Sequence, residues 1–442
     1  MYRSIEPLLK SWKSQKDRLP LILRGARQVG KSFIIEKLGR EEFEHLVIAN
    51  FEYMPELITC FDTLNPNEIC SKLEVFLNQK IIPGKTLLFL DEIQNCPKAI
   101  TALRYFKEKM ENLHVIAAGS LLEFALKEKQ FSFPVGRVQF LYLKPLSFDE
   151  YLINIDRNNL LNFLNRCSLS EPLDSSMHEL CMKHLREYFL LGGMPAVIRK
   201  FIETSSFKDC EQTLTLLLET YRNDFPKYAS KTEYQYLQLF FEKAPGLITQ
   251  QFKFSHIDQE VRSAPLTRAL QQLNWAGLIQ TVIGTSASGI PLQAHAKDSL
   301  LKLLFLDLGL VNRSLKLDLT STWSQDLLTI NSGALAEQFV GQELLAYADP
   351  FAKEQLYFWK REKAGSSAEI DYVMQIDGKI IPIEVKAGAT GSLKSLSLFM
   401  QEKKSICGIR ISQHPLSLHQ GILSVPLYMI RQLPRLVNTI TG

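Results

Sequence analysis

The sequence lacks the features that would indicate disulfide bonds, a zinc site or a membrane segment. Its seven cysteines are scattered, with no Cys-x-x-Cys pair and no Cys/His cluster. An odd, dispersed set of this kind is typical of reduced thiols. No stretch approaches the roughly 20 apolar residues that a membrane helix needs, and the charged N-terminal segment has no apolar signal core. We therefore expect a cytoplasmic protein with no membrane partner.

The chain also lacks a strong charge of either sign. It has 51 basic and 47 acidic residues, which give a net charge of +4. This excess is too small to indicate a nucleic-acid partner by itself, although a local basic groove would be compatible with it. With 442 residues, of which 46% are hydrophobic, the chain is long enough for roughly three domains of about 150 residues.

Short apolar runs alternate with helical patterns in the first third of the chain. Such alternation predicts an α/β fold with a parallel sheet. The runs predicted as strands are LPLILR (19–24), FEHLVIANFE (43–52), KTLLFLDE (85–92), NLHVIAAGS (112–120) and VQFLYLKPL (138–146).

The rest of the chain contains three segments with different sequence patterns. Residues 146–235 have helical periodicity, and Ser147 with Glu150 forms a predicted capping box. Residues 236–310 then read as helix, strand, Gly/Ser-rich tip and strand, which is the order of a winged helix. Residues 331–430 return to an α/β pattern.

The sequence GARQVGKS fits the phosphate-binding pattern GxxxxGK[ST]. It follows a predicted strand and opens a predicted helix, so its backbone N–H groups would cradle phosphates at the helix N-terminus. Lys31 would reach the β- and γ-phosphates of ATP, and Ser32 would ligate Mg²⁺. An incidental Gly-rich turn is the alternative. The residues predicted to bind nucleotide here are Gly25, Ala26, Arg27, Gln28, Val29, Gly30, Lys31 and Ser32.

Polar residues end two further predicted strands. Asp91 and Glu92 close TLLFLDE, at the edge where open α/β sheets bind ligands. We expect Asp91 to hold Mg²⁺ and Glu92 to polarise the attacking water. Ser120 ends the next strand and would help to place the γ-phosphate or the water. The alternative is a strand capped by solvated acids.

Two arginines are candidates for stabilising charge in the transition state. Arg137 lies in FPVGRV and Arg104 in ALRYFKE. A cation of this kind is needed where phosphoryl transfer builds up negative charge. A solvated surface arginine is the alternative for each.

Several motifs together resemble a known family. LRGARQVGKS, LLFLDEIQ, AAGSLL, GRVQFLYLKPLSFDEYL and YFLLGGMPAVI are similar to prokaryotic AAA+-type ATPases of the archaeal-ATPase-like group, in which a P-loop domain is fused to a C-terminal domain of unknown function. The resemblance implies an ATPase with a P-loop NTPase sheet, then a helical and winged-helix region, then a restriction-endonuclease-like α/β domain. On this basis we expect an ATPase domain at 1–150, a helical linker or lid region at 151–235, a winged-helix-like region at 236–325 and a nuclease-like domain at 326–442.

The stretch AEIDYVMQIDGKIIPIEVKAG, residues 368–388, predicts a β-hairpin around Asp377-Gly378. Counting outward from this turn places Asp371 opposite Glu384, with Cβ atoms roughly 5 Å apart. Lys386 falls on the same face, opposite Glu369. Two carboxylates that face each other are destabilising unless a cation lies between them.

This spacing resembles the core of PD-(D/E)XK nucleases. Asp371 and Glu384 would hold a divalent metal, together with Glu337 from the helix GALAEQFVGQELL, or else Glu343. Lys386 would stabilise developing charge. A solvated face with surface ion pairs is one alternative. A nuclease fold that binds nucleic acid without cutting it is another.

The predicted helix after Ser263 carries Arg268, Gln271, Gln272 and Asn274, which are residue types that read base edges or phosphates. The same helix also has an ordinary apolar stripe, so contact with a protein is an equal alternative.

The function predicted from the sequence is a Mg²⁺-dependent ATPase that couples its nucleotide state to a nuclease-like C-terminal domain that interacts with DNA. The alternative is an ATP-dependent switch that binds DNA or a protein and does not cut. A homo-oligomer is expected if the arginine acts on a neighbouring subunit.

Overall fold

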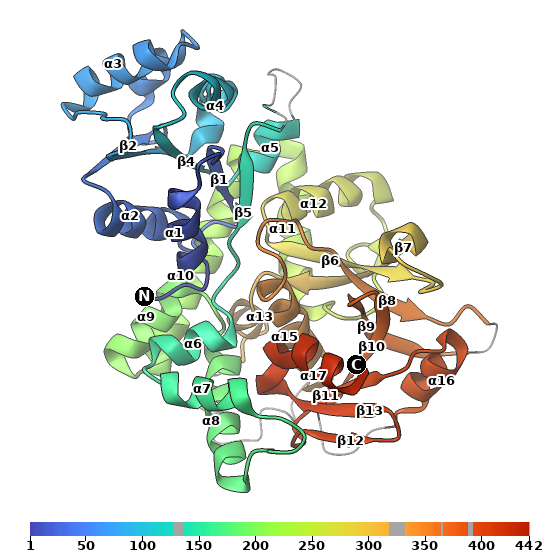
Figure 1. The fold of residues 1–442 in the computed structure, drawn as a ribbon. Coiled ribbons are helices and arrows are strands. Elements are labelled where there is room, and N and C mark those ends of the chain that lie inside the picture. The colour runs from blue at the N-terminus through green and yellow to red at the C-terminus, as the bar shows by residue number, and fades with distance from the viewer. Residues whose placement is uncertain (128–133, 135, 318–331, 364–365, 388–391, 442) are drawn as a thin grey trace. The chain divides into compact units, whose positions relative to one another are not determined.

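The computed structural model describes residues 1–441 except 128–133, 135, 318–331, 364–365 and 388–391. The chain divides into two compact units. Unit 1 comprises residues 1–144 with the short segments 275–277 and 349–353. Unit 2 comprises the remaining residues. Figure 1 draws the elements in chain order, from blue to red.

Unit 1 is built on a five-stranded parallel sheet in the order β2-β3-β4-β1-β5. All five predicted strands are present, and the α/β class is confirmed. The strands are β1 (Leu21–Arg24), β2 (His45–Asn50), β3 (Thr86–Asp91), β4 (His114–Ala118) and β5 (Gln139–Tyr142). The helices are α1 (Glu6–Ser14), α2 (Lys31–Glu42), η1 (Pro55–Phe61), α3 (Pro66–Leu77), η2 (Ile93–Asn95), α4 (Pro97–Lys109) and α5 (Leu122–Lys127).

Helices cover the unit 1 sheet on both faces because its strands are apolar on both sides. β3 and β4 are buried along their whole length, as parallel strands between helices should be. Leu88 and Leu90 of β3 pack in one core with α3 and α4. The buried residues of α2 lie outside that core, and α2 contacts β2, β3 and β4.

Unit 2 begins with helices and continues into a mixed eight-stranded sheet. The helices up to residue 275 are α6 (Phe148–Asn154), α7 (Asn158–Arg166), α8 (Ser175–Leu191), α9 (Pro195–Thr204), α10 (Phe207–Asp224), η3 (Phe225–Lys227), α11 (Lys231–Lys243), η4 (Ala244–Gly246), η5 (Phe254–His256) and α12 (Ser263–Trp275). Ser147 caps α6 in the predicted capping box with Glu150.

The sheet of unit 2 runs in the order β12-β13-β11-β10-β9-β8-β6-β7. Its strands are β6 (Ile279–Thr285), β7 (Ala296–Phe305), β8 (Leu356–Lys360), β9 (Glu369–Ile376), β10 (Lys379–Val385), β11 (Gly408–Ser412), β12 (Ser417–His419) and β13 (Ile422–Pro426). The other helices among the described residues are η6 (Leu292–His295), α13 (Leu308–Ser314), α15 (Ser332–Ala346), α16 (Lys394–Lys403), η7 (Leu427–Gln432) and α17 (Leu433–Thr441).

The predicted winged-helix segment has the expected order of elements, with α12 followed by the pair β6 and β7. However, β6 also pairs in parallel with β8. The wing-like hairpin therefore belongs to the same sheet as the strands predicted for the nuclease-like domain. The four predicted domain ranges remain predictions.

A buried polar network fixes the turn between α8 and α9. Asp307 is fully buried, accepts a 2.6 Å hydrogen bond from Gly193 N and caps α13 by accepting from Leu310 N. Gly193 O in turn accepts from Leu146 N at 2.7 Å. Gly192 has φ 71° and ψ −168°, a conformation that is essentially restricted to glycine. The Gly-Gly segment is therefore a structural turn.

Substituting Gly192 with alanine should destabilise unit 2, because the new Cβ would lie 2.2 Å from Asp307 Oδ1. Gly378→Ala is the matched control, since Gly378 has a similar φ of +74° but open space around its Cβ position. We expect the control to cost roughly 1–2 kcal/mol of unfolding free energy and Gly192→Ala at least about 2 kcal/mol more. Urea unfolding measures both, and equal losses would contradict the network's importance.

Candidate functional site

The loop of residues 25–32 connects β1 to α2 at the carboxyl end of the sheet. Gly30 is the N-cap of α2 and takes a left-handed conformation, with φ 96°. A Cβ on Gly25, which has φ 149°, would lie 2.3 Å from Leu143 O. The loop thus packs directly on the backbone that follows β5, and its first glycine is required for this approach.

Lys31 is enclosed by this loop. Its side chain is buried, and Nζ donates hydrogen bonds of 2.9 Å to Gly25 O and 2.8 Å to Ala26 O. Burial lowers the pKa of the Lys31 ammonium to about 8, and the charges of Glu92 and Asp91 oppose this shift. A buried ammonium surrounded by backbone carbonyls would be stabilised by an anionic ligand such as a phosphate.

Arg3 donates hydrogen bonds that hold the loop in place, a role that the sequence did not predict. The Arg3 side chain is 3% exposed. Its Nη1 donates to Val29 O at 2.7 Å, and its Nη2 donates to Lys144 O at 2.6 Å. Arg3 therefore connects the loop to the last residue of unit 1 before Pro145. Its position near the N-terminus, far from the motif in sequence, gave no signal of this contact.

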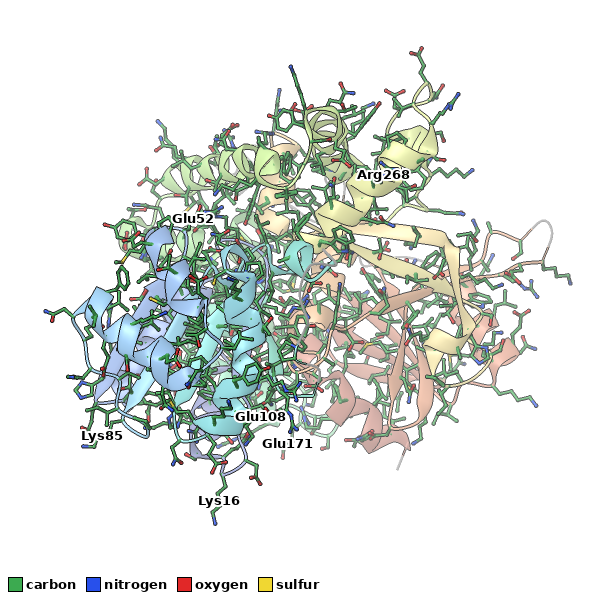
Figure 2. The ribbon with its side chains drawn as sticks, turned by 90° about the horizontal axis from the view of Figure 1, so that it is seen from above. Lys16, Glu52, Lys85, Glu108, Glu171 and Arg268 are labelled. Atoms are coloured by element: carbon green, nitrogen blue, oxygen red, sulfur yellow. The ribbon has the colours of Figure 1, made fainter. Side chains whose placement is uncertain are left out.

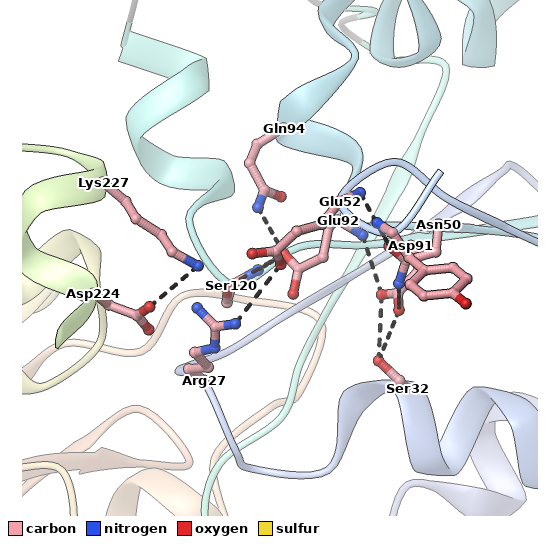
Figure 3. A network of polar contacts seen from close by, with 11 residues as sticks. Arg27, Ser32, Asn50, Glu52, Asp91, Glu92, Gln94, Ser120, Asp224 and Lys227 are labelled. Atoms are coloured by element: carbon pink, nitrogen blue, oxygen red, sulfur yellow. Dashed lines mark hydrogen bonds and ion pairs between the residues drawn. The ribbon is translucent and has the colours of Figure 1, made fainter. Parts of the chain in front are cut away.

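Asp91, at the end of β3, faces Ser32, as Figure 3 shows. Ser32 Oγ lies 3.3 Å and 3.2 Å from the two carboxylate oxygens of Asp91, and Asn50 Nδ2 donates to Oδ2 at 3.0 Å. Burial and the neighbouring Glu92 raise the pKa of Asp91. A hydroxyl and a buried carboxylate are oxygen ligands that suit Mg²⁺, so these residues fit the predicted ion. Asn50 is the last residue of β2, but the predicted strand continued to residue 52, so Asn50 was not recognised as a strand-end residue like Asp91.

Glu92 follows directly and takes a left-handed conformation, with φ 50° and ψ 46°. Its Oε2 accepts a 2.6 Å hydrogen bond from Gln94 Nε2 and 3.3 Å hydrogen bonds from both N and Oγ of Ser120 (Figure 3). A Cβ on Gly119 would lie 2.1 Å from Gln94 Oε1. Glu92 and Ser120 are thus brought together as the sequence suggested, with Gln94 as a partner that the sequence did not predict.

Arg137 and Arg104 both contact Glu108, which is labelled in Figure 2. Glu108 Oε1 lies 2.9 Å from Arg104 Nε and 3.4 Å from Arg137 Nε. Arg137 precedes β5, whose first residue pairs with Leu21 at the start of β1, whereas the phosphate loop follows the end of β1. The start of β5 and the first residue of the loop, Gly25, are about 13 Å apart along the strands, so Arg137 and the loop lie at opposite ends of these strands. This position does not favour a role for Arg137 at the loop of its own chain.

The second predicted site lies in unit 2, on the hairpin of β9 and β10. Asp377 and Gly378 both have positive φ, as the predicted turn requires. The predicted register is confirmed from Ile376–Lys379 to Tyr372–Ile383. One step further, Asp371 Oδ2 accepts a 2.8 Å hydrogen bond from Val385 N. Asp371 and Glu384 are therefore neighbours at the end of this ladder.

A cation already lies among the carboxylates of this cluster, and the sequence did not predict it. Lys302 of β7 has a side chain that is 2% exposed. Its Nζ lies 2.9 Å from Glu337 Oε1, 2.7 Å from Glu369 Oε1 and 3.7 Å from Asp371 Oδ1. Although burial opposes it, the charges of these three carboxylates raise the pKa of Lys302. The sequence gives no hint of this, because β7 lies more than 30 residues from each of them.

The predicted pairing of Lys386 with Glu369 is wrong. Lys386 N donates to Ile411 O, so the chain pairs with β11 at this point, and Lys386 Nζ contacts Glu384 Oε1 at 2.5 Å. The β9–β10 ladder ends at the pair of Tyr372 and Ile383, and the carboxylate of Glu369 contacts Lys302. Burial, and to a smaller extent the negative charge of Asp371, raises the pKa of Glu384 to about 7. The same two causes, in the same order, raise the pKa of Glu337.

Two further predictions can be located. Glu343 accepts from Phe148 N at 3.0 Å and from Tyr188 OH at 3.3 Å, so it belongs to a different buried network from Glu337. On α12, Arg268 and Gln271 are exposed, while Leu266, Leu270 and Leu273 form its buried stripe. Figure 2 labels Arg268.

No described helix has the length and apolar character to cross a membrane. Within the described ranges, no group of three or more His, Cys, Asp or Glu residues is arranged to hold a metal ion.

Two of the solved structures that match the chain resemble it weakly. A Walker-type ATPase of Pyrococcus abyssi is 16% identical, with a TM-score of 0.45 over 71% of this chain and 95% of that chain. The ORC2 protein of Aeropyrum pernix, solved as ADPNP–ADP complexes, is 12% identical, with a TM-score of 0.36 over 73% of this chain and 96% of that one. Scores this low add no argument about function. No curated protein matches the sequence.

Three family models match separate parts of the chain. Residues 182–321 match a domain of unknown function (DUF8612), and residues 332–430 match another (DUF4143). Residues 17–152 match the model of an AAA domain. The described loop, Lys31 and the acidic pair at the end of β3 all lie within this last range. The N-terminal part of the chain therefore has a P-loop NTPase fold, and its residues 17–152 are similar to an AAA domain.

Proposed function

We propose that the chain binds ATP with Mg²⁺ at the loop of residues 25–32, hydrolyses it, and passes its nucleotide state to unit 2. The observation that carries the proposal is the enclosed Lys31 ammonium, which lies beside Asp91 and Glu92 at the same edge of the sheet. The backbone N–H groups of the loop and the N-terminus of α2 would hold the phosphates. Lys31 would exchange its two carbonyl partners for phosphate oxygens.

Each remaining polar residue has a role in this proposal. Ser32 and Asp91 would hold Mg²⁺, which when bound neutralises charge on the phosphates. Glu92 would accept hydrogen bonding from the attacking water and polarise it. Ser120 and Gln94 hold one oxygen of Glu92, which restricts the direction of its carboxylate. Arg137 would act on a neighbouring chain of a homo-oligomer.

A cytoplasmic location completes the proposal, since all seven cysteines are free thiols.

For unit 2 we propose a nuclease-like region that interacts with DNA without cutting it. Lys302 supports this choice, because an ammonium among Glu337, Glu369 and Asp371 competes with a divalent metal for the same oxygens. The second candidate is a metal-dependent nuclease that uses Asp371, Glu384, Glu337 and Lys386. Glu384 Oε2, which is buried and has no hydrogen-bond partner among the described residues, favours that candidate. A switch that binds a protein partner is the remaining alternative.

Glu92→Gln should abolish hydrolysis while leaving nucleotide binding nearly unchanged. An amide keeps the shape of the side chain but cannot polarise water as a base, so turnover should fall by about 10²–10⁴-fold. Steady-state phosphate release and equilibrium binding of a fluorescent ATP analogue measure the two effects. Glu44→Gln is the matched control, since Glu44 forms an exposed ion pair with Lys85. Parent-level turnover in Glu92→Gln would rule out this role.

Nucleotide binding should take up a proton above about pH 8. In the nucleotide-free protein, Lys31 loses its proton as the pH rises through its lowered pKa. A bound phosphate favours the charged form of Lys31 and therefore raises this pKa. Affinity should therefore fall above this pH, with no uptake by Lys31 well below it. Calorimetry in buffers of different ionisation enthalpy measures the uptake. Lys31→Arg keeps its charge and should show no such uptake, so equal uptake in both proteins would contradict the assignment.

Plasmid and single-stranded DNA should remain intact in the presence of Mn²⁺ or Mg²⁺, with and without ATP. The same samples should show DNA binding by fluorescence anisotropy. Cleavage by the parent protein that disappears in Lys386→Ala would instead establish the metal-dependent nuclease. Neither cleavage nor binding would leave the switch with a protein partner.

A further inference from the structure

The backbone around Lys302 is fixed by pairing with β6 on one side and by hydrogen bonds from residues 249 and 252 to the neighbouring carbonyls. The position of Lys302 is therefore set by the fold. Lys302 pairs with Val282 across the β6–β7 ladder. The neighbouring residues are also fixed, because Leu303 O accepts from Thr249 N at 2.9 Å and Leu301 O accepts from Phe252 N at 2.7 Å. Nζ also lies 5.2 Å from the centroid of the Phe358 ring, at cation–π distance.

The carboxylates around Lys302 come from two different elements. Glu337 projects from α15, while Glu369 and Asp371 project from β9. The hydrogen bonds of 2.9 Å and 2.7 Å to Glu337 and Glu369 are charge-assisted pairs of ordinary length. Breaking a buried pair of this kind costs several kcal/mol, since a charge would be left without a partner.

A divalent metal at the same place would have to displace this ammonium. Metal ions bind carboxylate oxygens at roughly 2.0–2.6 Å, so a metal on Glu337 Oε1 and Glu369 Oε1 would compete with Nζ, which lies 2.9 Å and 2.7 Å from these two oxygens. The next carboxylate, Glu384, is also engaged, since its Oε1 contacts Lys386. Lys302 of β7 and Lys386, which directly follows β10, thus contact oxygens of all four carboxylates, while Glu384 Oε2 has no hydrogen-bond partner among the described residues.

We propose that the Lys302 ammonium is the built-in cation of this cluster and takes the place of a divalent metal. The carboxylates then serve to lock β7, α15 and β9 together, and the region acts without metal. The inference rests on the nuclease-like interpretation of unit 2 and is independent of ATP hydrolysis in unit 1. The chemistry expected of the region is binding of a partner and not hydrolysis of a phosphodiester.

Mn²⁺ titration without nucleotide, followed by the loss of the electron paramagnetic resonance signal of free Mn²⁺, tests this directly. The protein carries Asp91→Asn, which removes the metal ligand proposed in unit 1 and separates the two sites. We expect no bound Mn²⁺ in this background. Adding Lys302→Gln should create a site, and adding Glu337→Gln to that variant should remove it.

The matched control is Lys297→Gln, which removes a more exposed lysine of β7 that pairs with Glu362 and should create no site. If circular dichroism shows that Lys302→Gln does not fold, the double variant Lys302→Gln with Glu369→Gln is used in its place. This double variant removes one charge of each sign. Mn²⁺ binding in the Asp91→Asn protein that is lost with Glu337→Gln would overturn the proposal. A folded Lys302→Gln protein that binds no Mn²⁺ would also overturn it.

Discussion

Parallel pairing of β1, β3 and β4 is the constraint on which the nucleotide site depends. It brings the carboxyl ends of three strands to one edge, so residues far apart in sequence, such as Lys31, Asp91 and Ser120, meet there. The parallel pairing of β1 with β5 places Arg137 at the opposite end of these strands. The short loop after β1 is possible only because Gly25 packs without a side chain against Leu143 O. The chemistry of unit 1 therefore follows from strand direction and from one close backbone contact.

Each unit contains a buried lysine, and the two lysines differ in their partners and in the direction of their pKa shifts. Among the described residues, the hydrogen-bond partners of Lys31 are neutral carbonyls, and burial lowers its pKa, so the charged form gains from an arriving anion. Lys302 is paired with carboxylates that raise its pKa, so its charge is already satisfied. A buried ammonium is costly without a partner and stable with one. The first arrangement suits reversible ligand binding, whereas the second suits a permanent structural contact.

The sequence predicts the local features well and the distant contacts poorly. The five strands of unit 1 and the register of the β9–β10 hairpin follow from apolar runs and from turn residues, which are local signals. The pairing of β6 with β8, the contact of Arg3 with Val29 and the position of Lys302 depend on tertiary packing, which periodicity does not encode. The error at Lys386 has the same origin, since the hairpin ladder ends at the pair of Tyr372 and Ile383 and Val385 N then donates to the side chain of Asp371, which the turn residues do not predict.

A crystal structure with a non-hydrolysable ATP analogue and Mg²⁺ tests the central claim most directly. The account predicts that Lys31 Nζ leaves Gly25 O and Ala26 O and contacts phosphate oxygens, with Mg²⁺ beside Ser32 and Asp91. It also predicts that Lys302 stays among its carboxylates with no metal density near it. Phosphates bound away from residues 25–32, with Lys31 still on its two carbonyls, would contradict the account.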